Sequence, residues 1–165
     1  MLNKNRIWPL AAFVFICLVG YGARIAIGDV YSAAEARQLL EALSRAGLYL
    51  GSAIATASAT VLALMLTLIG MINRMEKEFD REAFLNVDLV AKLATSSLMM
   101  SLVVLLAFVL PIGEFEELPD RWYTILYDVL FEGSVLMVAL IAATVVMIYR
   151  TLQRVMSKIT PGEDV

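Results

Sequence analysis

The feature that most constrains this sequence is a set of four long apolar windows separated by short charged segments. A helix needs about 20 mostly apolar residues to cross the hydrocarbon core of a bilayer, and each window reaches that length. Because backbone hydrogen bonds inside a bilayer must be satisfied within the protein, helices are favoured over open strands. The windows are residues 7–27, 48–72, 89–112 and 125–148. We therefore expect one all-α integral membrane domain, residues 1–165, with four transmembrane helices.

The composition agrees with an integral membrane protein and excludes several kinds of cofactor and metal site. Hydrophobic residues make up 61% of the chain, well above the proportion in ordinary soluble domains. Histidine is absent and there is a single cysteine, Cys17. The usual ligands for haem, copper and zinc are therefore missing, and no disulfide can form within one chain. We expect no cofactor, no metal site and no nucleic-acid partner.

Residues 32–46 interrupt the apolar pattern between the first two windows. Ser32 and Glu35 have the spacing of a capping box, which begins a helix. Apolar residues then fall on one helical face, with charged residues around the rest; the largest of them are Leu39, Leu40 and Leu43. We predict a short amphipathic helix that lies on the membrane or covers the bundle, with Gly47 as a hinge. The alternative is a helical extension that leads directly into the second span.

The second window is unusual because its first half is built from small residues. A stripe of small residues recurs every four positions and consists of Gly47, Gly51, Ala55, Ala59 and Ala63. A hydroxyl stripe lies on the adjoining helical face and consists of Ser52, Thr56 and Thr60. In membranes small residues allow helices to approach closely. Two interpretations stay open. The hydroxyls either bond to carbonyls of their own helix within a packed bundle, or they line a water-filled path.

Several ionisable side chains fall inside the apolar windows, where such groups are costly and are rarely kept without a partner or a task. Arg24 and Asp128 should lie at similar depths, so we predict an ion pair between them. Glu132 would then be unpaired, either protonated or facing an aqueous cavity. At the start of the third span, Asp88 and Lys92 have i,i+4 spacing, which predicts a structural ion pair.

The basic residues gather on one side of the predicted topology. Four spans bring both termini to that side, with Lys4, Arg6, Arg74, Lys77, Arg81, Arg150, Arg154 and Lys158. The positive-inside rule then predicts that both termini are cytoplasmic, with residues 150–165 as a tail. We expect the inner membrane of a bacterium. A basic start followed by an apolar run also matches a cleaved signal peptide, but the first window is longer than usual for one and contains Arg24.

These features favour a small homo-oligomeric protein that conducts or binds cations. The acidic loop at 114–120 would concentrate cations, and Asp128 and Glu132 would form an outer charged site. Ser52, Thr56 and Thr60 would line the path. The alternative is a non-catalytic accessory or assembly subunit that docks on another membrane protein. Asp88 with Lys92, and Asp128 with Glu132, could in principle do acid–base work. Because histidine is absent and no nucleophile arrangement is recognisable, we do not expect an enzyme.

Overall fold

The computed structural model describes residues 4–28, 33–72, 81–109 and 120–159. These segments form four helices: α1 (Lys4–Ile27), α2 (Ala33–Ile72), α3 (Arg81–Val109) and α4 (Asp120–Ile159). Each helix contains a stretch long and apolar enough to cross a membrane: Ile7–Ile27, Gln38–Gly70, Leu85–Val109 and Trp122–Gln153. The prediction of an all-α protein with four such helices is confirmed. Ser32 of the capping box, residues 73–80 and residues 114–119 of the acidic loop lie outside the described residues.

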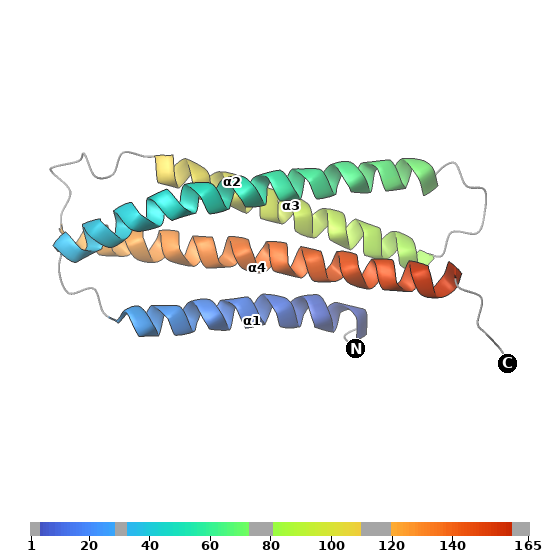
Figure 1. Ribbon diagram of the computed structural model, residues 1–165, viewed down its shortest axis with the longest axis horizontal. Helices are drawn as coiled ribbons and strands as arrows, with labels where there is room; N and C mark the ends of the chain where they lie inside the picture. The colour runs from blue at the N-terminus through green and yellow to red at the C-terminus, as the bar shows by residue number, and fades with distance from the viewer. Residues whose placement is uncertain (1–3, 29–32, 73–80, 110–119, 160–165) are drawn as a thin grey trace.

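The helices run alternately up and down, so that the start of α1 and the end of α4 lie toward the same end of the bundle (Figure 1). α4 is central: it packs against α2 and α3 on one side and against α1 on the other. α2 and α3 also pack against each other. Within the described residues, α1 therefore contacts the rest of the protein almost entirely through α4.

The prediction of a short, separate amphipathic helix is wrong. α2 is one continuous helix of 40 residues, from Ala33 into the second span. Leu40 is 7% exposed and belongs to the hydrophobic core together with Phe108, Tyr123 and Tyr127. The apolar face of this segment is covered by α3 and α4, so it does not need a membrane surface to bury it. The alternative interpretation, a helical extension, is the one that the structure adopts.

Gly47 is not a hinge but a packing position. A Cβ atom built at Gly47 would overlap the ring of Phe108, and one at Gly51 would lie 2.9 Å from the side chain of Leu105. Both glycines are thus used for close approach of α2 to α3, as small residues are in membrane helix pairs. These contacts also fix the antiparallel register of α2 and α3.

α2 and α4 are longer than a bilayer requires. Each has 40 residues and is therefore about 60 Å long at about 1.5 Å per residue, against about 30 Å for the hydrocarbon core. α4 continues to Ile159, so residues 150–159 of the expected tail are helical. α1 ends at Ile27 and is followed by Gly28, whose φ of 79° suits glycine and whose N–H donates to the carbonyl of Arg24 at 3.2 Å.

Candidate functional site

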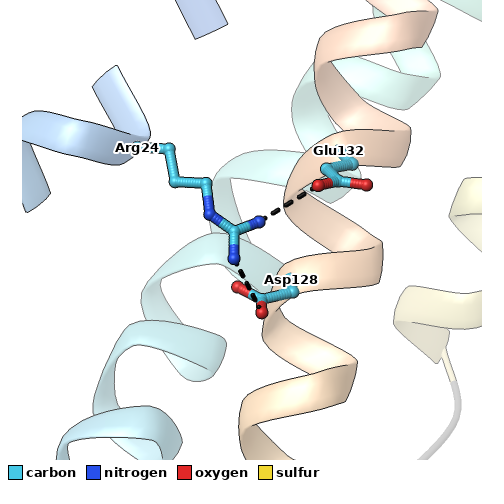
Figure 2. Close-up of polar contacts among 3 residues, drawn as sticks. All are labelled: Arg24, Asp128 and Glu132. Carbon is cyan, nitrogen blue, oxygen red and sulfur yellow. Dashed lines mark hydrogen bonds and ion pairs between the residues drawn. The ribbon is translucent and has the colours of Figure 1, made fainter. Parts of the chain in front are cut away.

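Arg24, in the last turn of α1, reaches across to α4 and binds two carboxylates (Figure 2). Its Nη2 donates to Asp128 Oδ2 at 2.9 Å and its Nη1 donates to Glu132 Oε1 at 3.0 Å. Asp128 and Glu132 are four residues apart and therefore share one face of α4. We call this cluster the Arg24 triad: Arg24, Asp128 and Glu132.

The predicted pair between Arg24 and Asp128 is present, but Glu132 is not unpaired as expected. The reason is the shape of the guanidinium group. Its two terminal nitrogens form a planar fork, which can bond to carboxylates one helical turn apart at the same time. A single arginine therefore serves both acidic residues of α4.

The triad has one excess negative charge when all three groups are ionised. Its members are unequally covered, because the exposed fraction of the side chain is 34% for Asp128, 41% for Arg24 and 71% for Glu132. Glu132 Oε1 is held by Arg24 while most of the side chain faces outward. The excess charge is therefore presented at Glu132.

A glycine allows α1 to lie close enough for these bonds. A Cβ atom at Gly20 would lie 2.5 Å from Cγ1 of Val135, and Gly20 is one turn before Arg24 on the same helical face. Gly20 was not among the residues predicted to form the site. Its i,i+4 spacing to an arginine inside an apolar window is the signal that indicates a close helix contact at this point.

A second polar contact joins the opposite ends of the same two helices. The guanidinium carbon of Arg150 lies 5.3 Å from the centre of the Trp8 ring, within the range of a cation–π interaction. α1 is thus attached to α4 at Trp8, at Gly20 and at Arg24. The rest of α1 is largely exposed, as Phe15 and Leu18 illustrate at 64% and 63%.

Two cavities lie along the α1–α4 interface beside the triad. The outer cavity, near the end of α1, has a volume of about 450 Å³, and its polar lining comes from Arg24, Thr124, Tyr127 and Asp128. The inner cavity, one to two turns further along the helices, has about 320 Å³, and its apolar lining includes Cys17, Phe131, Val135 and Leu136. Tyr21 and Arg24 line both. The triad therefore borders on space of the size that small ligands occupy.

The structure does not bring the hydroxyl stripe to the triad. Ser52, Thr56 and Thr60 are on an exposed face of α2, whereas the triad joins α1 to α4. Thr56 Oγ1 donates to the carbonyl of Ser52 at 2.9 Å, and Thr60 Oγ1 donates to that of Thr56 at 2.9 Å. The donors of Thr56 and Thr60 are thus used inside the helix, as one of the two interpretations proposed. Their hydroxyl oxygens keep lone pairs on this exposed face.

Asp88 and Lys92 form the expected pair within α3, with Nζ 2.7 Å from Oδ2. Both side chains are substantially exposed, at 43% and 70%. α3 begins at the end of the bundle where α4 ends, whereas Arg24 is near the opposite end (Figure 1). This pair is therefore separate from the triad.

Two buried hydroxyls were not singled out from the sequence. Ser58 of α2 and Ser97 of α3 are fully buried, and within the described part of the chain neither Oγ has a hydrogen-bond partner. The register set by the glycines of α2 places the two residues at the same level of the α2–α3 interface. Because both are small, this level is a further point of close helix approach.

No protein-family model, curated protein or solved structure matches this chain. Among the residues that the structure describes, no three acidic, cysteine or histidine side chains are grouped so as to hold a metal ion. What the site can do chemically therefore follows from the charges and the space of the Arg24 triad itself.

Proposed function

We propose that this protein is a homo-oligomeric membrane protein that binds cations at the Arg24 triad and conducts them across the bilayer. One observation carries the proposal: a single guanidinium faces two carboxylates, and the excess charge is presented at a 71% exposed Glu132. An excess charge within an apolar span is costly, and a counter-charge that binds there lowers this cost. A cation at Glu132 supplies that compensation.

The position of the site supports the proposal of an oligomer. The triad opens sideways from one copy, and the interior of the α2–α3–α4 bundle is filled by core side chains such as Met137 and Ala139, each 0% exposed. Copies arranged around an axis would repeat the acidic site as a ring, as cation channels do. Ser52, Thr56 and Thr60, on the exposed face of α2, would coordinate cations along the same path where a neighbouring copy brings that face to the ring.

The proposed orientation places both termini in the cytoplasm of a bacterium and the triad in the outer half of the inner membrane. The support is the excess of Lys and Arg on the side of the termini, combined with the even number of spanning helices. The acidic loop at 114–120 is then external. Its charges would raise the local concentration of cations near the triad.

Cation flux into liposomes tests this proposal, with the oligomeric mass measured on the same preparation. Wild type should conduct, and Glu132→Gln should lower the flux roughly fivefold, since exposed charge interactions are worth up to about 1 kcal/mol. Asp88→Asn is the matched control, because it removes an ion-paired carboxylate from another helix at the opposite end of the bundle. Unchanged flux in Glu132→Gln, or no flux from a folded wild type, contradicts the proposal.

The second candidate function is a non-catalytic accessory or assembly subunit of a larger membrane complex. The observation in its favour is α1, which contacts α4 along one side and leaves most of its apolar surface exposed. A stable stoichiometric complex with another membrane protein in the native membrane, without self-assembly of this chain, would favour this function over conduction.

A further inference from the structure

The two cavities beside the triad differ in polarity along the α1–α4 interface. The outer one, at the end of α1, has polar side chains from Thr124, Tyr127 and Asp128. The inner one, deeper along the apolar spans, is bounded mainly by Phe131, Val135 and Leu136, and Arg24 and Glu132 line it as well. Arg24 lies between them. A polar space near a helix end followed by an apolar space deeper in the span has the polarity order of a lipid headgroup and its chains.

The hydrogen-bonding groups of the triad are only partly used. Asp128 and Glu132 each give one carboxylate oxygen to Arg24, and within the described residues their second oxygens remain to be satisfied. The guanidinium likewise has N–H donors beyond the two that bond to carboxylates. In an apolar environment unsatisfied donors and acceptors are costly. A ligand that carries both a donor cation and an acceptor anion would satisfy both sets.

We infer that the α1–α4 interface binds a phospholipid whose headgroup carries a primary amine, with its ammonium at Asp128 and Glu132, its phosphate at Arg24 and an acyl chain in the inner cavity. This inference rests on the proposed function, because it assigns a cationic ligand to the same carboxylates. The lipid ammonium and an inorganic cation then compete for Glu132. The surrounding lipid thereby regulates the occupancy of the cation site.

The charges distinguish this headgroup from the alternatives. A primary ammonium offers N–H donors to the two free carboxylate oxygens, as a lysine side chain does. A quaternary ammonium of the same charge has no N–H group to donate. An anionic headgroup without an amine would be repelled by the excess negative charge of the triad. The preference is therefore specific for an amine that can donate.

The test measures retained lipids by native mass spectrometry on the full chain, using phosphatidylethanolamine, its N-methyl and N,N-dimethyl derivatives, and phosphatidylcholine with identical acyl chains. Retention by wild type should fall along this series, by roughly fivefold between its ends. Glu132→Gln should reduce the difference in retention between the four lipids, whereas Asp88→Asn should leave that difference unchanged. Because the series varies the lipid, wild type alone tests the inference even if a variant folds poorly.

Equal retention of all four headgroups by wild type overturns the inference, as does an unchanged preference in folded Glu132→Gln. Cation flux in phosphatidylcholine vesicles is measured in parallel. If flux depends on Glu132 but retention shows no headgroup preference, the proposed function is supported and the lipid site is contradicted. If retention shows a headgroup preference but there is no flux, the lipid site is supported and conduction is contradicted. Inhibition of flux by added phosphatidylethanolamine supports competition at Glu132.

Discussion

Gly20 of α1 lies directly against Val135 of α4, with no space for a side chain at position 20. This contact is one turn from Arg24, whose side chain must span the gap between the two helices to reach both carboxylates. The distance between α1 and α4 at Gly20 therefore determines whether the Arg24 triad can form.

We predict that Gly20→Val separates α1 from α4 and destabilises the folded protein by about 1–3 kcal/mol, the usual cost of overpacking a filled interface. Gly22→Val is the matched control, because no atom lies within 4 Å of a Cβ built there. Thermal unfolding of both variants in detergent measures the difference. Equal melting temperatures for the two would contradict the close contact at Gly20.

Replacing the arginine should be more harmful than replacing either carboxylate. Arg24→Gln leaves two neighbouring negative charges without compensation, whereas Asp128→Asn leaves Arg24 paired with Glu132. In double-mutant cycles we expect a coupling energy of up to about 1 kcal/mol per pair, because the groups are partly exposed. The coupling of Arg24 to the less exposed Asp128 should exceed that to Glu132. The reverse order would mean that coverage of the carboxylates by protein does not control the strength of these bonds.

Part of this site could be predicted from the sequence. The pairing of Arg24 with Asp128 follows from counting helical turns inward from the ends of two apolar windows. The same counting could not assign Glu132, because it treats each ion pair as exclusive and a guanidinium is not. The close contact at Gly20 depends on which helix faces α1, and periodicity within a single helix does not contain that information.

The amphipathic segment at residues 32–46 illustrates a second limit of structure prediction from the sequence. The pattern of Leu39, Leu40 and Leu43 shows that one face must be covered, but an apolar face is covered equally well by lipid or by protein. Here Tyr123 and Tyr127 of α4 and Phe108 of α3 complete the core around Leu40. Gly47 lowers helix propensity and so indicated a hinge, whereas its missing side chain is needed for the contact with Phe108.

The packing of this segment can be tested through Leu40. Leu40→Ala removes a side chain that is 7% exposed and should lower the free energy of unfolding by about 2–4 kcal/mol. Leu48→Ala, at a position 37% exposed on the same helix, should cost clearly less. Thermal unfolding in detergent gives both values. If Leu40→Ala had no effect there, the segment would depend on the membrane rather than on α3 and α4.

Substitutions in the hydroxyl stripe distinguish a role in conduction from a role in helix packing alone. Thr56→Val and Thr60→Val keep the shape of the side chains while removing the hydroxyls that donate to carbonyls four residues earlier. Since an α-helix already satisfies those carbonyls, stability should change by less than about 1 kcal/mol. Under the proposed function, cation flux should nevertheless fall, because the outward lone pairs are lost.

Thr67→Val is the control, because Thr67 makes the same kind of bond, to the carbonyl of Ala63 at 3.0 Å. It lies about two turns beyond Thr60 and is not one of the proposed path residues. Flux that is unchanged in both Thr56→Val and Thr60→Val would exclude this face of α2 from the conduction path and restrict the cation site to the α1–α4 interface.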